Sequence, residues 1–386
     1  MARHSSRIEL SQSALRNNLA FVRERVGPHP TISLVVKANA YGHGIQEIVP
    51  MARRAGVTHF AAASGHEAQE AIDAGLDGAR VMVMGILTNA DLPWAIENDV
   101  EFFVFELSRL EYAAEIARDV GRPARIHLEV ETGGNRTGLP EAELPKAARI
   151  IRKHADRFHL VGICTHLAGA ESLATRFRID RQLSAFQRVR AFAAKRRLQP
   201  EFFHVASSAA ALALPERTAF DLVRVGVSAY GLWPSPDVYN LHLKRTGKSR
   251  DNPLSRVLSW KTEILHVKSI EKDSFVGYGT SYQAARHMRI AVLPLGYANG
   301  YPREMSNKGH VLVRGHKAPI VGLVNMNLFM VDVTKIPGVS TGDVVVLVGR
   351  QRNNVISIAS FSEFSSALNT EFLCRLPAAI PRSAVR

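Results

Sequence analysis

One lysine near the start of the chain has the surroundings of a nucleophilic amine. Lys37 lies at the end of the apolar run 32–38 and is followed by AlaAsnAlaTyrGlyHisGly. An ammonium group that loses its water has a lowered pKa, and the neutral amine can then form a Schiff base with a carbonyl compound. A lysine that only extends to solvent from a strand end is the alternative, and position alone favours it.

Two stretches of small residues could hold an anionic group. SerSerAlaAla at 207–210 and GlyValSer at 226–228 follow apolar runs, and backbone N–H groups and hydroxyls at such places often bind phosphate. Ordinary capping is the alternative, because Ser and Gly are common in loops. Arg224 lies inside an apolar run, so its guanidinium needs a carboxylate or a ligand ring nitrogen as acceptor. A lysine, a phosphate site and an inward arginine together suggest pyridoxal phosphate.

These residues require a scaffold that brings distant segments together. Between about residues 30 and 230, apolar runs rich in Val, Ile and Phe alternate with amphipathic stretches, as in parallel sheets covered by helices. The eight runs are 32–38, 58–64, 79–87, 101–107, 125–132, 158–166, 201–207 and 221–229. Eight strands alternating with helices predict an α/β fold, a (β/α)8 TIM-type barrel, with active residues at the carboxyl ends of its strands. A doubly wound sheet is the alternative, but no GxGxxG motif follows the first run.

The pattern changes after about residue 233. The polar, proline-containing stretch 233–253 is typical of a linker. The runs beyond it are β-rich with Gly and Pro between them, and one late helix is expected around 359–369. We therefore predict a barrel over residues 1–240, followed by a C-terminal mostly-β domain over residues 241–386.

Composition limits the classes of function. The 386 residues carry 49 Lys and Arg against 35 Asp and Glu, a net charge of +14, and these charges are spread along the chain. A solvated basic surface is therefore expected, rather than a nucleic-acid or membrane interface. Two cysteines, Cys164 and Cys374, cannot form a disulfide framework, and no signal peptide or run of ~18 apolar residues occurs. We expect a cytoplasmic protein, and we assign no metal ligands.

Four motifs together resemble one enzyme family. VVKANAYGHG at 35–44, VGYGTSY at 276–282, GYANGY at 296–301 and GLVNMNLFMVDVT at 322–334 are similar, in this order, to motifs of alanine racemases. The resemblance extends over almost the whole chain. It implies a pyridoxal 5′-phosphate enzyme made of a barrel and a β domain. It also implies a homodimer whose active sites are shared between subunits.

The resemblance implies a role for individual residues. Lys37 would carry the cofactor and act as one catalytic base, serving the D-enantiomer, and Tyr278 of the other subunit would be the second base. The remaining implied cofactor contacts are Tyr41, His166, Ser208, Arg224, Gly226 and Val227. The implied substrate-side residues are Arg136, Tyr297 and Met326. Without the resemblance, a Tyr in a GlyTyrGly turn and a lone His such as His166 would more often be structural.

The sequence departs from the family pattern at four places. Glu129 stands where a lysine, often carbamylated, is common, and we expect its carboxylate to pair with Arg136. Asn299 and Asn327 replace aspartates, and the Pro377–Ala379 segment replaces larger residues near the C-terminus. None of these changes affects the two implied bases.

The function that the resemblance implies is racemisation of L-alanine and D-alanine by two bases, supplying D-alanine for peptidoglycan. A broader amino-acid racemase acting on serine, lysine or arginine is the alternative. A barrel that only carries the cofactor is disfavoured by the C-terminal domain that holds Tyr278. A decarboxylase is disfavoured by Arg224, because those enzymes normally pair the ring nitrogen with an acid.

Overall fold

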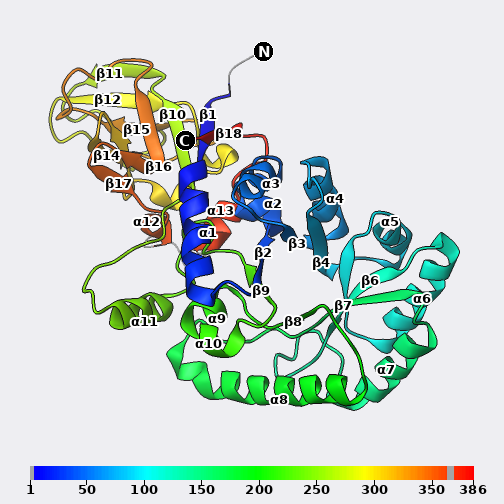
Figure 1. The fold of residues 1–386 in the computed structure, drawn as a ribbon. Coiled ribbons are helices and arrows are strands. Elements are labelled where there is room, and N and C mark those ends of the chain that lie inside the picture. The colour runs from blue at the N-terminus through cyan, green and yellow to red at the C-terminus, as the bar shows by residue number, and fades with distance from the viewer. Residues whose placement is uncertain (1–3, 363–368) are drawn as a thin grey trace. The chain divides into compact units, whose positions relative to one another are not determined.

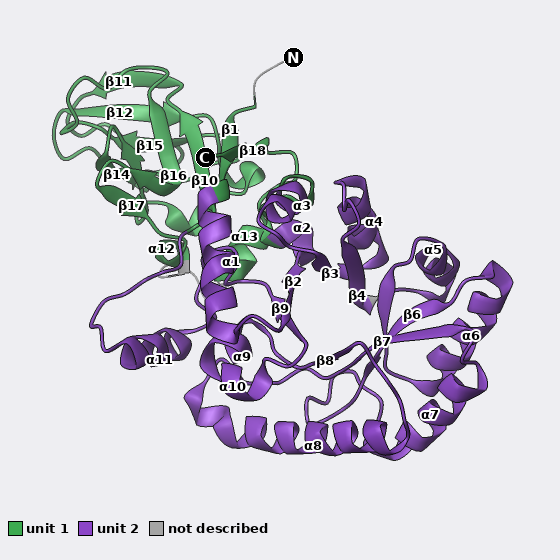
Figure 2. Ribbon diagram, in the orientation of Figure 1, with its two compact units in different colours: residues 1–12, 41–47, 256–386 green, residues 13–40, 48–255 purple. Residues whose placement is uncertain are grey.

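The computed structural model describes residues 4–362 and 369–386 of the chain. The chain forms two compact units, and each unit is made of segments that are separate in the sequence (Figure 2). Residues 13–40 and 48–255 form one unit, called the barrel unit below. Residues 1–12, 41–47 and 256–386 form the other, called the β unit.

The barrel unit contains eight parallel strands in the order β8-β7-β6-β5-β4-β3-β2-β9 (Figure 1). These strands are β2 (Thr31–Val35), β3 (His59–Ser64), β4 (Arg80–Ile86), β5 (Glu101–Val104), β6 (Ala124–Glu129), β7 (Phe158–Cys164), β8 (Phe202–His204) and β9 (Leu222–Val225). The backbone N–H of Arg224 donates to Ala206 O at 3.0 Å, and that of Asp221 to Phe203 O at 3.1 Å, so β9 is also joined to the β8 segment. All eight predicted strands are present, and the predicted barrel is confirmed.

Helices alternate with these strands and surround them in Figure 1. They are α1 (Gln12–Val26), α2 (Lys37–Tyr41), α3 (Ile45–Arg54), α4 (Gly65–Asp73), α5 (Leu92–Glu97), α6 (Leu107–Val120), α7 (Leu144–Lys153), α8 (Arg176–Lys195), α9 (Ser208–Ala213), α10 (Pro215–Thr218) and α11 (Pro236–Thr246), with single turns at η1 (Asn89–Asp91), η2 (Glu141–Glu143) and η3 (Leu173–Thr175). Small side chains let the helices pack closely, as where α6 buries Ala113, Ala114 and Ala117. Both faces of the strands are therefore covered, which explains their continuous apolar sequences.

The stretch 233–253 is more regular than a linker, because it contains α11. The Ser235 hydroxyl caps this helix by accepting from Val238 N at 3.2 Å. Pro236 occupies the first helical turn, where a missing N–H costs nothing, and Gly247 ends the helix with φ 68°. The proline that suggested a linker is thus a helix-start residue.

The β unit is mostly β structure, as predicted. Its sheet is mostly antiparallel, in the order β11-β12-β15-β14-β13-β16-β10-β1-β18, with β17 pairing β16. Its strands are β1 (Ser6–Ser11), β10 (Leu258–Glu263), β11 (His266–Ile270), β12 (Met288–Leu293), β13 (His310–Val313), β14 (His316–Val321), β15 (Phe329–Asp332), β16 (Val344–Gln351), β17 (Asn354–Ile356) and β18 (Arg382–Val385). Strand β1 comes from the N-terminus, pairing antiparallel with β10 and parallel with β18. The predicted late helix corresponds to α12 (Ala359–Ser362) and α13 (Asn369–Cys374), and its middle lies outside the described residues.

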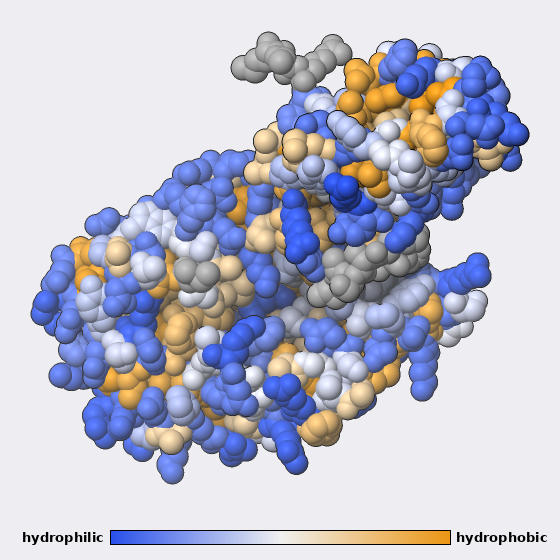
Figure 3. Space-filling view, turned by 180° about the vertical axis from the view of Figure 1, so that it is seen from behind, coloured by the Kyte–Doolittle hydropathy of each residue, from blue (hydrophilic) through white to orange (hydrophobic). Residues whose placement is uncertain are grey.

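Surface character agrees with the dispersed charge of the sequence. Hydrophilic side chains predominate on the face in Figure 3, and apolar ones are interspersed among them, as on most globular proteins. None of the helices in the described part of the chain is both long and apolar enough to cross a membrane.

Candidate active site

Lys37 opens a left-handed turn directly after β2. Ala38, Asn39 and Ala40 have φ of 53°, 52° and 52°, and Tyr41 has φ 53°. A residue with a Cβ atom loses roughly 1–2 kcal/mol in this conformation, so the turn is strained. Strained backbone of this kind clusters at functional sites, where the surrounding structure imposes it.

Glu67, in the first turn of α4, holds the strained segment. Its Oε1 accepts a hydrogen bond from Ala38 N at 2.6 Å, and its Oε2 accepts from Ala63 N at 2.8 Å. Ser64 caps the same helix by accepting from Glu67 N at 3.3 Å. Glu67 is not among the residues predicted from the sequence, although Ser64 and Glu67 have the Ser-x-x-Glu spacing of a capping box. Here the glutamate bonds the lysine turn instead of closing that box.

Arg224, on β9, is a buried cation that no carboxylate pairs in the described part of the chain. Its Nη1 donates to Nδ1 of His204, and its Nη2 donates to the carbonyl oxygens of Thr165 at 2.8 Å and Val205 at 3.2 Å. Its Nε–H makes no hydrogen bond to any described residue. A neutral ring nitrogen is an acceptor that would satisfy this donor.

His166 follows β7 and is held by Gln182 of α8. The Gln182 side chain donates to His166 O at 3.0 Å and accepts from Ala168 N at 2.9 Å. Burial, followed by the charges of Arg224, Arg136 and Lys37, lowers the pKa of His166 to about 3. The imidazole is therefore neutral at ordinary pH, and three cationic residues act on it.

Small residues after β8 and β9 form a cradle of hydrogen-bonding groups. The Ser208 hydroxyl accepts from Gly226 N at 2.9 Å and so ties the two loops together beside Val227. The hydroxyl oxygens of Ser207 and Ser228 are buried and have no hydrogen-bond partner among the described residues. Buried hydroxyls are nearly always bonded, so these two groups fit an anionic ligand such as a phosphate.

A cavity of about 210 Å³ lies over the ends of β6 and β7. It is lined by Glu129, Glu131, Gly134, Arg136, Thr137, Thr165, His166, Leu167, Ala168, Gly169 and Glu171. Glu129 is buried, and within residues 4–362 and 369–386 its Oε2 has no hydrogen-bond partner. Burial raises the pKa of Glu129, against the opposing hydrogen bond from Thr137.

The expected ion pair between Glu129 and Arg136 is not formed among the described residues. Arg136 is exposed on a turn that a different acid, Glu131, organises. The Glu131 carboxylate accepts from the N–H groups of Gly133, of Gly134 at 2.7 Å and of Asn135 at 2.8 Å. The turn therefore has its own carboxylate, and Glu129 is left with an unsatisfied oxygen.

The remaining candidate residues belong to the β unit: Tyr41, Tyr278, Tyr297 and Met326. Tyr278 is 73% exposed, in the loop between β11 and β12, while the preceding Val276 packs in the core of the unit. Tyr297 N donates to Asn325 O at 3.0 Å and Ala298 N donates to Met326 O at 3.0 Å, so these two segments lie side by side.

Two of the sequence departures have a structural role within the β unit. The Asn299 side-chain oxygen accepts from Gly296 N at 3.0 Å and closes the turn η4 (Tyr297–Asn299). The carbonyl oxygens of Pro377 and Ala378 accept from Arg382, which also donates to Gly42 O at 3.0 Å. Asn327 is exposed, and nothing in the structure explains its replacement of Asp.

Seven candidate residues thus meet at one edge of the barrel sheet. Lys37, Arg136, His166, Ser208, Arg224, Gly226 and Val227 lie on β9 or follow β2, β6, β7, β8 and β9. The arrangement offers an amine, a neutral imidazole, a buried arginine donor and an anion cradle. These groups fit pyridoxal 5′-phosphate, because its aldehyde, ring nitrogen and phosphate each find a matching group.

The sequence as a whole is similar to known alanine racemases. Residues 10–234 match the alanine racemase N-terminal domain, and residues 257–384 match the alanine racemase C-terminal domain. An alanine racemase of Methanococcus maripaludis is 33% identical over 383 residues, which cover 99% of each chain. One of Leptospira interrogans is 32% identical over 384 residues, covering 99% of this chain and 96% of that protein.

Solved structures give the same result. The alanine racemase of Streptomyces lavendulae, 30% identical, matches with a TM-score of 0.87 over 100% of this chain and 98% of that one. A histidine racemase of Leuconostoc mesenteroides subsp. sake, 28% identical, matches with a TM-score of 0.88 over 100% and 99%. The fold therefore occurs both in a protein named alanine racemase and in one named histidine racemase.

Proposed function

Because the chain belongs to the alanine racemase family and is an amino-acid racemase, we propose that it interconverts L-alanine and D-alanine with pyridoxal 5′-phosphate held on Lys37. One observation carries this proposal. Arg224 is buried without a carboxylate partner in the described chain, and its Nε–H has no acceptor there. That donor suits a ring nitrogen, and the hydroxyls of Ser207 and Ser228 suit a phosphate.

The bound cofactor would supply an electron sink for negative charge at the substrate Cα. Arg224 is always protonated, so it donates to the ring nitrogen and keeps that nitrogen from carrying a proton itself. The amine of Lys37 moves a proton at Cα on one face of the substrate. The phenol of Tyr278 moves a proton on the opposite face, because inversion requires one base on each side.

We propose that Tyr278 comes from a second copy of the chain. Tyr278 is 73% exposed, Tyr297 41% and Met326 56%, so the β unit carries three large exposed apolar side chains at candidate positions. Exposed apolar clusters of this kind mark protein contacts. In a homodimer with shared sites, the second subunit would cover these side chains, and Tyr278 would lie beside the Lys37 of that subunit.

Complementation tests the shared site. Lys37→Ala and Tyr278→Phe are each expected to be inactive as pure dimers. After unfolding and refolding as an equal mixture, half of the dimers are mixed and carry one intact site, so about a quarter of the wild-type activity returns. Recovery of none would contradict the shared site.

We propose alanine as the main substrate, with serine second, because a pocket discriminates only about 10²-fold against an added hydroxyl. Broader use of serine, lysine or arginine is the alternative. The similarity to a histidine racemase makes that alternative worth testing. We further propose that the reaction takes place in the cytoplasm and supplies D-alanine for peptidoglycan. Two cysteines in 386 residues cannot form a disulfide framework, which fits a reducing compartment.

The deciding experiment is a racemisation assay across the amino acids, read by chiral chromatography. Alanine is expected to react fastest. Faster turnover of lysine or arginine would replace the alanine assignment with the broader one. In parallel, borohydride reduction and peptide mapping should place the cofactor on Lys37, and an adduct on another lysine would overturn the cofactor assignment.

A further inference from the structure

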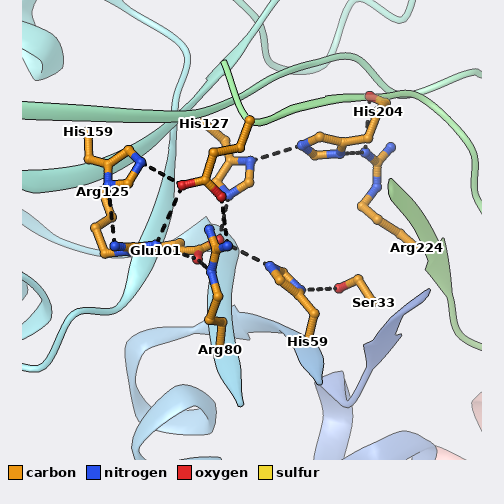
Figure 4. A network of polar contacts seen from close by, with 10 residues as sticks. Ser33, His59, Arg80, Glu101, Arg125, His127, His159, His204 and Arg224 are labelled. Carbon is orange, nitrogen blue, oxygen red and sulfur yellow. Dashed lines mark hydrogen bonds and ion pairs between the residues drawn. The ribbon is translucent and has the colours of Figure 1, made fainter. Parts of the chain in front are cut away.

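A continuous chain of buried polar side chains crosses the barrel interior and ends at Arg224 (Figure 4). Its members are Glu101, His127 and His204, each with no exposed surface. Glu101 begins β5, His127 lies within β6 and His204 ends β8. The chain therefore runs from the amino-terminal edge of the strands toward the candidate active site at the carboxyl edge.

The hydrogen bonds along this chain all have one direction. Arg224 Nη1 contacts His204 Nδ1, His204 Nε2 lies 2.9 Å from His127 Nδ1, and His127 Nε2 lies 2.8 Å from Glu101 Oε2. Arginine can only donate and an ionised carboxylate can only accept. A neutral imidazole has one donor and one acceptor, so both histidines must carry the proton on Nε2.

The charges agree with this assignment. Burial alone would raise the pKa of Glu101, but the hydrogen bonds from His127 and His59 hold it well below its usual value. Burial and the charge of Arg224 hold the pKa of His204 well below normal, and burial lowers the pKa of His127 despite Glu101. The carboxylate is thus ionised and both imidazoles are neutral, with donor facing acceptor at every link.

A metal ion is the other use that His59, Glu101 and His127 suggest, because their ligand atoms lie within 4.8 Å of one another. The surroundings argue against it. Oε1 of Glu101 accepts from Arg80, and Arg125 Nη2 lies 3.6 Å from the same oxygen. Two guanidinium groups already neutralise the carboxylate, and a cation added there would be repelled.

We propose that Glu101, His127 and His204 are positioning residues that fix the orientation of Arg224, and thereby of its Nε–H. Nη2 of Arg224 is held by two carbonyl oxygens, while the acceptors of Nη1 are the Nδ1 lone pair of His204 and, at 3.4 Å, the carbonyl oxygen of the same residue. That lone pair is available only while the His204 proton is on Nε2, which the chain to Glu101 maintains. This inference rests on the proposed function, in which Arg224 meets the ring nitrogen of the cofactor.

Gly162 offers a way to break the chain without removing a polar group. A Cβ atom at this position of β7 would lie 2.2 Å from His127 Nδ1 and 3.0 Å from His204 Nε2. Gly162→Ala therefore forces the two imidazoles apart. Glu101→Gln is the complementary change, because it keeps the shape of the side chain and removes its charge.

His59 provides the matched control. Its Nε2 contacts the same Glu101 oxygen at 3.1 Å, and it is as buried as the members of the chain. Its Nδ1, however, lies 2.9 Å from Ser33 Oγ rather than from His204. Ser33 stands opposite Arg224 in the β2–β9 pairing, but no hydrogen bond among the described residues joins the Ser33 hydroxyl to the guanidinium. If the variants act by disturbing core packing, His59→Gln should be affected as much as the other two. If they act by breaking the Glu101–His127–His204 chain, called the relay below, His59→Gln should behave like the wild type.

The experiment measures the binding of two probes to each apoenzyme. The probes are pyridoxal 5′-phosphate and its analogue with C–H in place of the ring nitrogen. In Gly162→Ala and Glu101→Gln the affinity for the first probe should fall about tenfold, the lower end of the loss when an outer partner is removed at metal sites. The affinity for the analogue should stay unchanged, and His59→Gln should bind both probes like the wild type.

Equal weakening of both probes, or an equal loss in His59→Gln, would overturn the relay. Nitrogen-15 spectra of the wild-type apoenzyme give a second readout that needs no variant to fold. They should show a protonated Nε2 and a bare Nδ1 on both His127 and His204, and a proton on Nδ1 of His204 would overturn the proposal. Failure of both probes to bind the wild type would instead count against the proposed function, while the spectra would still decide the relay.

Discussion

Oε1 of Glu67 accepts a hydrogen bond of 2.6 Å from the backbone N–H of Ala38, the residue after Lys37. The other carboxylate oxygen bonds Ala63. One side chain thus ties the end of β3 to a turn in which four consecutive non-glycine residues have positive φ. Glu67 therefore positions Lys37 through the backbone of the next residue, Ala38.

Glu67→Ala should therefore loosen the lysine turn. The hydrogen bonds to a charged group that it removes are worth about 2 kcal/mol in unfolding free energy, and trapping of the cofactor on Lys37 by borohydride should slow. Glu70→Ala, on the same helix, is the control, and its stability should stay close to that of the wild type. Equal stability of the two variants would contradict the role given to Glu67. The measurements are denaturant unfolding and mass spectrometry of the reduced adduct.

Tyr278→Phe keeps the ring and removes the proton carrier. Racemisation in both directions should fall by about 10²–10⁴-fold, the usual cost of losing an acid–base group. Exchange of the α-hydrogen of D-alanine for deuterium should persist, because Lys37 still serves that enantiomer, and exchange from L-alanine should be lost. Tyr282→Phe is the control in the same loop, since that hydroxyl contacts Met288 Sδ at 3.7 Å. Equal loss of exchange from both enantiomers would refute the two-base scheme.

Glu129 and Glu131 should respond in opposite ways to the same substitution. Glu129 is buried with an unsatisfied oxygen and a pKa raised by burial, so Glu129→Gln should raise the thermal midpoint at neutral pH. Glu131 accepts hydrogen bonds from three backbone N–H groups. Glu131→Gln places the amide NH2 donor against these N–H donors, so it should lower the thermal midpoint and reduce the free energy of unfolding by about 1–3 kcal/mol. Scanning calorimetry decides, and a lower midpoint for Glu129→Gln would mean that its charge is satisfied.

Acid should destabilise the protein through its buried histidines. The pKa of His166 is lowered to about 3, chiefly by burial, and those of His127 and His204 are lowered as well. The unfolded chain binds more protons than the folded one below pH 6.5, so stability falls as pH drops from 6.5 toward 3. Each such histidine contributes up to about 1.4 kcal/mol per pH unit. Thermal midpoints measured from pH 8 to 4 should show a shallower decline in His166→Gln than in His66→Gln, where the original side chain is exposed.

The barrel was readable from the sequence because its strands are buried on both faces. Short, nearly continuous apolar runs such as 101–107 and 221–229 lack the three- and four-residue spacing of apolar residues that indicates a helix. The count of eight runs then sufficed, because parallel strands need crossovers of the observed length. Some candidate residues followed, since Lys37 and Arg224 lie inside runs and Ser208 comes directly after one. Tyr278, Tyr297 and Met326 lie beyond the eight runs and depended on the family resemblance.

Other features depend on contacts that sequence spacing does not show. Glu101 begins one apolar run and His59 is the second residue of another, so both look like strand-edge polar residues. Only the closed sheet brings them to His127. Glu129 and Arg136 are seven residues apart, which suggested a pair, but Glu131 is nearer to the turn and organises it. The helix α11 was missed because its starting proline is equally typical of a loop.

The pairing of β1 also sets an order of events during synthesis. Ile8 pairs with Trp260 and with Arg382, so β1 is completed by strands that are synthesised about 250 and about 370 residues later. At 5–20 residues per second, roughly 20–75 s separate the synthesis of β1 from that of β18. The β unit cannot close before then, whereas every strand of the barrel already exists by residue 225. During that interval β1 has unpaired edges, and a nascent chain stalled after residue 255 would display them to any chaperone that binds extended segments.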